Sequence, residues 1–561
     1  MRWANGDKMT MVLLAVLVAV LLASEDAKAD FTFGEPTNLG SPINTSSGDC
    51  IDCLSSDGLE MYLDSGRAGG YGTWDIWVVR RPTTNDTWGP PENLGSPVNS
   101  SSSEAFACLS SDGLELYFES HQRPGGYGSY DIWVTKRLTK DHDWGAPQNL
   151  GPIINSAAGE GGPWISSDGL ELYFGSNRSG GSGSWDIWVT RRVTINDPWE
   201  PPINLGAVVN SSAEEGAPFI SADGLRLFFG GGYHGPHRPG GFGKSDMWLT
   251  TRTAVDEPWG TPVNLGSVVN GSSLDDGPRI SPDGSMLYFN SERPGGFGGA
   301  FGDIYQAPII PIVDFNGDGK IDGRDILIMA DHWGMDDSVC DIGPMPWGDG
   351  VVDIEDLKVL AEYIGEPVDD PTLITHWALD ESEGLMAADS AGENDATVMG
   401  VPAWQPAGGA VDGALELNGA TFVAADFVLS LADGPFSVFA WVKGGAPGQV
   451  IVSQAAGSNW LMADAATGAL MTELQSGDRT SEALCSDAVI TDGNWHRVGF
   501  VWDGSARNLY VDDILVAEDT DTPPEGGSDR ILIGCGKTMT PNTFFTGLID
   551  DVRIYNRVVR P

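Results

Sequence analysis

The run DFNGDGKIDGRD, from Asp314 to Asp325, carries potential metal ligands at a regular spacing. Oxygen-bearing side chains stand at its positions 1, 3, 5, 9 and 12, which are Asp314, Asn316, Asp318, Asp322 and Asp325. Lys320 offers its backbone carbonyl at position 7, and Gly319 allows the turn at position 6. Ca²⁺ takes six to eight hard oxygen ligands, and this spacing wraps them around one ion. The run therefore predicts a calcium site, with Ca²⁺ as the expected cofactor.

A second, less complete copy of this run lies between Cys340 and Gly365. The residues that match positions 5, 6, 9 and 12 of the first run are Asp349, Gly350, Asp353 and Asp356. Positions 1 and 3 fall on Met345 and Trp347, which carry no carboxylate. Asp341 is therefore expected to act as the first ligand of an expanded loop, and the second calcium ion rests on a weaker ligand set.

Both runs lead into apolar stretches that suit a short helix, ILIMADHW and LKVLAEYIG. The pair, over residues 309–368, resembles a type I dockerin, whose EF-hand-like loops end in Asp, as at Asp325, where an ordinary EF-hand ends in Glu. The resemblance implies a cohesin-like or cell-surface protein as partner. Dockerins select their partner through positions 10 and 11, which here are Gly323 and Arg324, then Ile354 and Glu355. Because these depart from the familiar hydroxyl-rich pair, a calcium-stabilised spacer without a protein partner is the alternative.

Ahead of this module the chain repeats one unit five times. Each unit contains an Asp-Gly turn, a run such as LELYF, a glycine cluster such as GGYG, a run such as DIWVTKR and an Asn-Leu-Gly segment. The aspartates of the turns are Asp57, Asp112, Asp168, Asp223 and Asp283. Short β-branched and aromatic runs between glycine turns indicate strands, and four strands per unit are typical of a propeller blade. The units resemble TolB-type, WD40-like repeats over residues 30–308, which predicts a β-propeller.

The ends of the repeat array predict how the propeller closes. FGEPTNLG, from Phe33, precedes the first turn, whereas the fifth unit ends at DIYQ, Asp303–Gln306, without such a segment. The N-terminal segment is therefore expected to complete the last blade. This count gives five blades, because a sixth would need a degenerate unit that the sequence does not contain.

Three charged positions recur in every unit. An acid precedes each Asp-Gly turn by eight residues, an arginine follows the second strand and an aspartate opens the third. A catalytic site needs unlike groups that meet once, whereas a structural bond is needed in every blade, so ion pairs and turn caps are predicted. In the alternative, the acids before the turns ring one mouth of the central channel and bind a cation or a basic partner. These acids are Asp49, Glu104, Glu160, Glu215 and Asp275.

Residues 369–561 contain alternating apolar runs such as FSVFAWV and HRVGFVW between Gly/Asp turns, a pattern typical of an antiparallel sandwich. The segments HWALDESEG, DSAGENDATVMG, GALELNGATFV, FSVFAWVKG and FFTGLIDDVRIYNR resemble, in this order, the laminin-G-like, concanavalin A-like jelly roll. The expected fold is therefore mainly β, with a propeller, a small α-helical calcium module and a C-terminal jelly roll.

The jelly-roll resemblance also implies a site. In such domains a Ca²⁺ often lies between the early Asp-Ser-x-Gly loop and the last strand, which points to Asp389, Asn394 and Asp550 as ligands. Glucanases of this architecture carry paired catalytic glutamates in an ExDxE-like pattern, which this chain lacks, so the domain is expected to bind and not to cleave. The tryptophans that are either core residues or platforms for sugar rings are Trp404, Trp460 and Trp495.

Residues 1–29 have the pattern of a secretory signal, with an apolar stretch, Met11–Ala23, between basic residues and a small-residue cleavage site. That stretch is shorter than the ~20 residues that span a bilayer. The chain is therefore expected to be exported, to the extracellular space, the cell surface or the periplasm, without membrane insertion after cleavage. In an exported chain disulfides can form, and Cys485 and Cys535 are a candidate pair.

The net charge of −48 argues against nucleic acids and anionic membranes as partners. Three functions remain. The first is an exported, multimodular, calcium-binding protein that recognises carbohydrate or a surface glycoconjugate and is not an enzyme. The second is a glycoside hydrolase or lyase with unlike acids gathered at the propeller mouth, and the third is a structural cell-surface or assembly protein. An asymmetric cluster of acids in the propeller channel would favour the enzyme.

Overall fold

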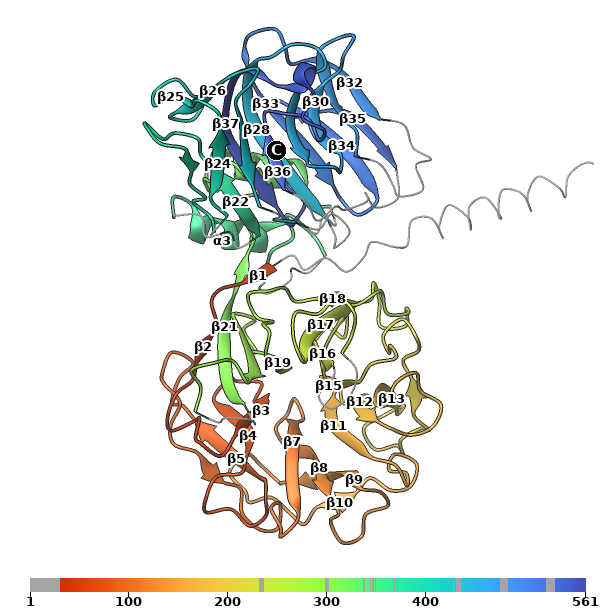
Figure 1. Cartoon of the computed structure of the whole chain (residues 1–561). Helices are drawn as coiled ribbons and strands as arrows, with labels where there is room; N and C mark the ends of the chain where they lie inside the picture. The colour runs from red at the N-terminus through yellow and green to blue at the C-terminus, as the bar shows by residue number, and fades with distance from the viewer. Residues whose placement is uncertain are drawn as a thin grey trace, which may run out of the picture. The chain divides into compact units, whose positions relative to one another are not determined.

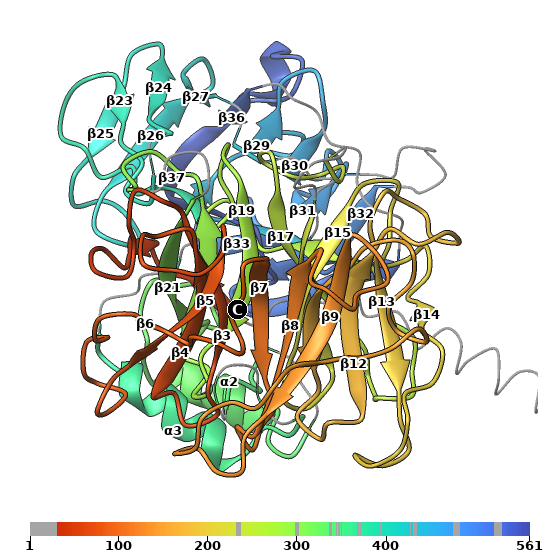
Figure 2. The same cartoon turned by 90° about the horizontal axis from the view of Figure 1, so that it is seen from below.

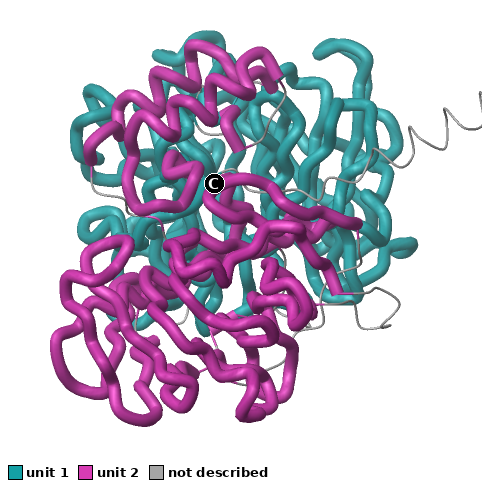
Figure 3. Tube along the Cα trace, turned by 90° about the horizontal axis from the view of Figure 1, so that it is seen from above, with its two compact units in different colours: residues 1–311, 342–349 teal, residues 312–341, 350–561 magenta. Residues whose placement is uncertain are grey.

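The structure is a computed structural model that describes residues 31–231, 237–297, 302–335, 339–343, 345, 348, 350–366, 370, 372–392, 394–426, 428–429, 435–474, 483–520 and 530–561. The predicted signal, residues 1–29, lies outside them. The chain divides into two compact units, which Figure 3 colours separately: residues 1–311 with 342–349, and residues 312–341 with 350–561. In the described part of the chain, no helix has the length and apolar character needed to cross a membrane.

Five antiparallel blades surround a common centre in the first unit (Figure 1), and Figure 2 shows their strands from the side. The first two blades contain β3 (Asp49–Leu54), β4 (Glu60–Ser65), β5 (Asp75–Arg80) and β6 (Glu92–Asn93), then β7 (Ser103–Leu109), β8 (Glu115–His121), β9 (Tyr130–Lys136) and β10 (Gln148–Asn149). The next two contain β11 (Glu160–Ile165), β12 (Glu171–Ser176), β13 (Asp186–Arg191) and β14 (Ile203–Asn204), then β15 (Glu215–Ile220), β16 (Arg226–Gly231), β17 (Asp246–Thr251) and β18 (Val263–Asn264).

Both ends of the repeat array build the fifth blade. Its strands are β19 (Asp275–Ile280), β20 (Met286–Ser291), β21 (Asp303–Pro311), β2 (Thr37–Asn38) and β1 (Phe31–Phe33). Strand β2 pairs with β21 so that Thr37 lies opposite Gln306, and β1 pairs with β21 as far as Pro311. The predicted five blades and the predicted closure by the N-terminal segment are confirmed.

The second unit contains a sandwich of two antiparallel sheets, each with eight strands. In spatial order the first sheet contains β25 (Ala403–Gln405), β26 (Ala414–Asn418), β37 (Thr546–Tyr555), β28 (Phe436–Gly444), β33 (Trp495–Trp502), β34 (Ala506–Val511) and β35 (Ile514–Thr520), with β22 (Leu373–Trp377) paired to β37. The second contains β23 (Met386–Ala387), β24 (Ala396–Met399), β27 (Phe422–Ala425), β36 (Ile531–Ile533), β29 (Val450–Gln454), β30 (Asn459–Ala463), β31 (Ala469–Thr472) and β32 (Leu484–Val489). The predicted jelly roll and the mainly β fold are confirmed.

Two α-helices follow the predicted calcium loops, α2 (Gly323–Asp331) and α3 (Ile354–Tyr363). Each begins at a capping box in which an N-cap aspartate and the aspartate three residues later bond to each other's backbone amides. The pairs are Asp322 with Asp325, and Asp353 with Asp356. The last two predicted ligands of each loop therefore also start the helix that follows it.

Candidate functional site

The first predicted calcium loop is closed by hydrogen bonds from its own backbone to its acids. Asp314 accepts from the amides of Asp318 (3.2 Å) and Gly319 (2.9 Å), and Asp325 accepts from the amide of Phe315 (2.9 Å). Asn316 donates to the Asp318 carboxylate at 3.2 Å. The loop's own backbone thus holds the carboxylates of Asp314 and Asp325, and both are buried.

Burial raises the pKa of Asp314 to about 6, although Arg557 opposes the rise and the charges of Asp325 and Asp318 add to it. Burial also raises the pKa of Asp325. Acids held together in this way repel one another, and a bound cation removes that repulsion. Among the described residues, however, no group of three or more His, Cys, Asp or Glu side chains has a metal-binding arrangement, so the calcium ion stays a prediction.

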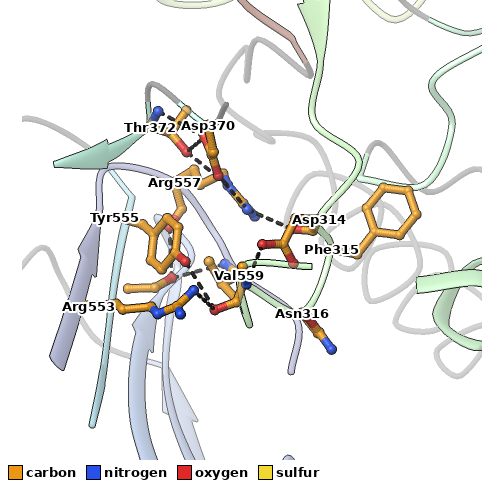
Figure 4. A network of polar contacts seen from close by, with 12 residues as sticks. Asp314, Phe315, Asn316, Asp370, Thr372, Arg553, Tyr555, Arg557 and Val559 are labelled. Carbon is orange, nitrogen blue, oxygen red and sulfur yellow. Dashed lines mark hydrogen bonds and ion pairs between the residues drawn. The ribbon is translucent and has the colours of Figure 1, made fainter. Parts of the chain in front are cut away.

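The loop packs against the jelly roll within the second unit (Figure 4). Side chains of the jelly roll donate to backbone carbonyls of residues 314–317. These bonds join Arg557 Nη2 to Asp314 O (2.7 Å), Arg497 Nη2 to Asn316 O (2.9 Å) and Tyr555 Oη to Gly317 O (3.0 Å). Gly317 has a positive φ of 61°, and a Cβ on it would lie 2.7 Å from Val559. The jelly roll therefore helps to fix the backbone of the calcium loop.

The second loop repeats part of this geometry. The amide of Gly350 donates to Asp341 at 2.7 Å, as the amide of Gly319 does to Asp314 in the first loop. Asp356 accepts from the amide of Asp353 at 2.6 Å. Asp341 thus occupies the place expected of the first ligand in an expanded loop, whereas Asp349 lies outside the described residues.

Calcium titration of the full chain is expected to show at least one site that is lost in the Asp314→Ala, Asp325→Ala double variant. The physical reason is that these two carboxylates are buried together and need a positive charge. Isothermal calorimetry measures it, with Asp426→Ala as the control because the Asp426 side chain is 91% exposed. If the double variant and the parent give equal heats of calcium binding, this loop is not the calcium site.

The jelly-roll resemblance implies two acids and one amide as ligands, Asp389, Asp550 and Asn394, and these lie in two separate hydrogen-bonded groups. Asp389 accepts from the amides of His376 (2.9 Å) and Asn394 (3.0 Å), and the Asn394 side chain donates to Ile374 O (3.3 Å). Asp550 instead accepts from the amides of Ala410 and Val411, at 2.7 and 2.8 Å. No described bond joins the two groups. Asp550 keeps one buried oxygen without a hydrogen-bond partner among the described residues, and burial raises its pKa to about 7.

The three tryptophans behave differently from one another. Trp460 is fully buried in the sandwich core, so it cannot serve as a sugar platform, and this alternative is wrong for it. Trp404 packs against the same core and donates to Gly384 O at 3.0 Å. Trp495 is partly exposed. The proposed disulfide is also wrong, because Cys485 and Cys535 are free, the first exposed and the second buried.

A polar cluster that the sequence analysis missed lies on the second jelly-roll sheet. The Lys537 ammonium is 2.8 Å from Glu473 Oε2, which also accepts from Asn459 Nδ2 at 2.9 Å. The Lys537 and Glu473 side chains are 34% and 31% exposed, so both reach solvent. The loop that carries Lys537 continues to Phe544, whose ring packs edge-on against Phe422 at 5.8 Å.

In the propeller, the recurring charges are structural. Each arginine pairs with the acid of its own blade, and all five acids have fully buried side chains. The pairs are Arg67–Asp49, Arg123–Glu104 (3.3 Å), Arg178–Glu160 (3.0 Å), Arg238–Glu215 (3.3 Å) and Arg293–Asp275 (2.8 Å). The aspartate that opens the third strand caps the glycine turn, as Asp131 does for the Tyr127 amide. The predicted ion pairs and caps are confirmed. The alternative, in which these acids ring one mouth of the channel and bind a cation or a basic partner, is wrong, because each carboxylate is buried against an arginine of its own blade.

A second set of propeller acids breaks the fivefold pattern. Trp164 packs against the core clusters between four successive pairs of blades, which places it on the propeller axis. Arg279 lies over its ring, 4.7 Å from the centroid. Around them lie four carboxylates of the first, second and fifth blades, Asp52, Asp64, Glu119 and Asp276. Glu214, which precedes β15, adds to the rise in the Asp276 pKa. The sequence analysis missed this cluster because its members do not share one position in the repeat.

Bulges in the inner strands orient these carboxylates. The register of each inner strand shifts near its middle, which frees a backbone amide for a side chain. The resulting bonds run from Phe106 N to Asp64 (3.3 Å), from Gly162 N to Glu119 (3.1 Å) and from Gly277 N to Asp276 (2.6 Å). Burial raises the pKa of Asp64 and of Asp276 to about 6, and that of Asp52 well above its usual range.

Replacing Glu119 by Gln is expected to stabilise the propeller at alkaline pH and not at pH 4. Burial and the charge of Asp64 raise the Glu119 pKa to about 8, against the Gly162 amide. A raised pKa in the folded carboxyl means that stability falls as pH rises from the unfolded pKa, ~4.3, to about 8. The glutamine variant does not lose stability in this way. Its free energy of unfolding should therefore exceed that of the parent by at least ~1 kcal/mol at pH 8. Thermal unfolding in amine-free buffer at both pH values tests it, and an equal difference at pH 4 and 8 would contradict it.

Comparison with known proteins identifies one part of the chain. Residues 417–561 match the family model Laminin_G_3, of the concanavalin A-like lectin/glucanases superfamily. The C-terminal sandwich therefore carries a concanavalin A-like domain. No curated protein matches the chain.

Three of the solved structures that match the chain are distant from it in sequence. A sialidase from Trypanosoma rangeli with the inhibitor DANA is 13% identical, with a TM-score of 0.40 over 94% of this chain and 92% of that one. TolB from Acinetobacter baumannii is 15% identical, with a TM-score of 0.31 over 53% and 68% of the two chains. Domain 4 of a GH43 extracellular arabinanase from Geobacillus stearothermophilus, in complex with arabinotriose, is 20% identical, with a TM-score of 0.24 over 33% and 93%. Likenesses this weak carry no argument about function.

Proposed function

We propose that the protein is an exported, calcium-binding carbohydrate-recognition protein whose jelly roll contacts the sugar. The observation that supports it most is the Asn459–Glu473–Lys537 cluster on the concanavalin A-like domain. The Glu473 carboxylate lies 2.8 Å from the Lys537 ammonium and 2.9 Å from the Asn459 amide nitrogen, and the three groups offer acceptors and donors to neighbouring hydroxyl groups. The partly exposed Phe544 on the same loop adds an aromatic surface.

Binding to a glycan array is the test, with the full chain. The Glu473→Ala, Lys537→Ala double variant is expected to lose at least ~10-fold in affinity for any glycan that the parent binds, because the polar groups that orient a sugar are removed. Lys443→Ala is the matched control, since Lys443 is an exposed lysine of the same domain. If the double variant keeps its binding, the sugar site lies elsewhere. If the parent binds no glycan on the array, the proposal is wrong.

A second candidate function is carbohydrate cleavage inside the propeller. The asymmetric set of Asp52, Asp64, Glu119 and Asp276 is the feature that the hydrolase or lyase alternative requires. Burial separates their pKa values, with Glu119 at about 8 and Asp64 at about 6, and such a separation suits an acid and a base. Release of reducing ends or unsaturated sugars from bound glycans, abolished in Glu119→Gln, would establish this function over binding alone.

A further inference from the structure

Among the described residues the four propeller carboxylates form no ion pair, and one buried cation, Arg279, lies near them. Arg279, which is buried beside them, donates to carbonyl oxygens instead, at Asp52 O (2.5 Å), Ala217 O (3.2 Å) and Pro278 O (2.8 Å). Asp52 is fully buried, and neither of its carboxylate oxygens has a hydrogen-bond partner among the described residues. One arginine cannot neutralise four carboxylates, and buried charge is costly, so this arrangement calls for protons or for a further bound cation.

The fold holds these carboxylates in place. Asp64, Glu119 and Asp276 each accept one amide from an inner-strand bulge. Glycines leave room for two of them, because a Cβ on Gly161 would lie 2.0 Å from Glu119 Oε2 and a Cβ on Gly230 would lie 1.6 Å from Asp276 Oδ1. The acids are therefore fixed from three different blades, each with acceptor capacity left over.

Open space lies on the same inner surface. A Cβ on Gly216 would meet nothing within 4 Å, and a Cβ on Gly175 would lie 3.8 Å from the Gly216 Cα. Glu119 and Asp276 both remain partly exposed, so solvent reaches the cluster. We call this space, which lies beside Gly216 on the inner surface that also carries Glu119 and Asp276, the cup.

We propose that the cup binds the primary ammonium group of an amine-bearing ligand. An ammonium carries three N–H donors on one atom, which matches three carboxylates that reach inward from separate blades. It also adds a positive charge to the single one that Arg279 brings to the four carboxylates. A calcium ion, by contrast, needs six to eight oxygens around one point. The inference does not depend on sugar binding by the jelly roll.

Calorimetric titration of the full chain with methylammonium and with glucosamine, in amine-free buffer at pH 7, tests the proposal. Both are expected to bind saturably, and N-acetylglucosamine, which has no ammonium, is expected not to bind in the cup. The isosteric Glu119→Gln, Asp276→Asn variant should weaken methylammonium binding at least ~10-fold. The variant replaces bonds to the ionised Asp276, and to Glu119, which loses its proton when the ammonium binds, by bonds to neutral amides. Glu92→Gln, at a carboxylate whose side chain is 68% exposed, should leave it unchanged.

A second variant guards against a folding defect in the first. A Cβ at Gly216 meets nothing within 4 Å, so Gly216→Val fills open space and removes no carboxylate. It should abolish methylammonium binding while the thermal midpoint stays near that of the parent. The proposal is overturned if methylammonium does not bind the parent, if both cup variants bind it as tightly as the parent does, or if Ca²⁺ alone occupies the cup. Loss of glycan binding in the Lys537 variant with methylammonium binding intact would separate the two proposals.

Discussion

Removal of residues 31–44 is expected to unfold the whole propeller rather than to fray one end of it. The segment carries β1 and β2, which pair with β21 and join the first and last parts of the repeat array. It also buries Phe31, Phe33 and Ile43, each at most 4% exposed. At ~1.5–3 kcal/mol per buried side chain, their loss removes roughly as much as the ~5–15 kcal/mol that stabilises a domain.

Hydrogen bonds in the same segment add to this effect. The buried Asn44 side chain donates to Ile304 O and accepts from Ile304 N, both at 2.9 Å. The same pair of hydrogen bonds recurs in the other blades, between Asn99 and Ile76, Asn155 and Ile132, Asn210 and Ile187, and Asn270 and Met247. The deletion therefore leaves the backbone of β21 without partners that every other third strand keeps.

Circular dichroism and thermal unfolding of the truncated chain, beside a parent that begins at Asp30, measure the outcome. The expected result is loss of the propeller transition while the transition of the jelly roll persists, since the two belong to separate compact units. Two unchanged transitions would show that the fifth blade does not depend on its N-terminal strands.

The closure and the blade count could be predicted because each depends on a pattern that the sequence repeats. A segment that stands before the first unit and is missing from the last leaves one topological solution. The ion pairs could be predicted for the same reason, since the pair of Arg123 and Glu104 has a counterpart in every other blade. Periodicity thus identified what is structural in the propeller.

The propeller cup could not be predicted for the opposite reason. Asp64 and Glu119 occupy one position of the second strand, but the corresponding residues in the other blades are Gly175, Gly230 and Asn290. Asp276 comes from the inner strand instead and fills the room left at Gly230. These positions come together only through the strand bulges and the curvature of the propeller. Neither feature can be predicted from the amino-acid composition. A search for acids that break the repeat would have found them.

The contacts between the calcium loop and the jelly roll were missed on similar grounds. The spacing of the ligands predicted the loop itself, and the backbone bonds to Asp314 agree with it. Its docking partners, Arg497 and Arg557, stand far away in the chain, inside or beside apolar strands. An arginine inside or beside an apolar strand indicates a buried hydrogen-bond acceptor nearby, because a lone charge is rarely left in an apolar interior.

Arg557→Ala is expected to destabilise the second unit by roughly 3–5 kcal/mol, the cost of breaking one side of a buried ion pair. Arg557 is 8% exposed and its guanidinium lies 2.8 Å from Asp370, whose side chain is 6% exposed (Figure 4). It also donates to Thr372 Oγ1 at 2.9 Å and to Asp314 O at 2.7 Å. Its removal leaves the Asp370 carboxylate buried without its partner and the calcium loop without one of its anchors.

Chemical denaturation of the full chain measures this loss in the transition of the second unit. Arg530→Ala is the matched control, because Arg530 and its partner Asp426 are 68% and 91% exposed, and such a pair contributes at most ~1 kcal/mol. In an Arg557→Ala, Asp370→Asn double variant the loss should be smaller than in Arg557→Ala alone, since no unpaired charge stays buried. Calcium affinity should fall in Arg557→Ala and not in Arg530→Ala, because only the first releases the Asp314 carbonyl. An Arg557 variant as stable as the Arg530 variant would show that the loop and the jelly roll fold independently.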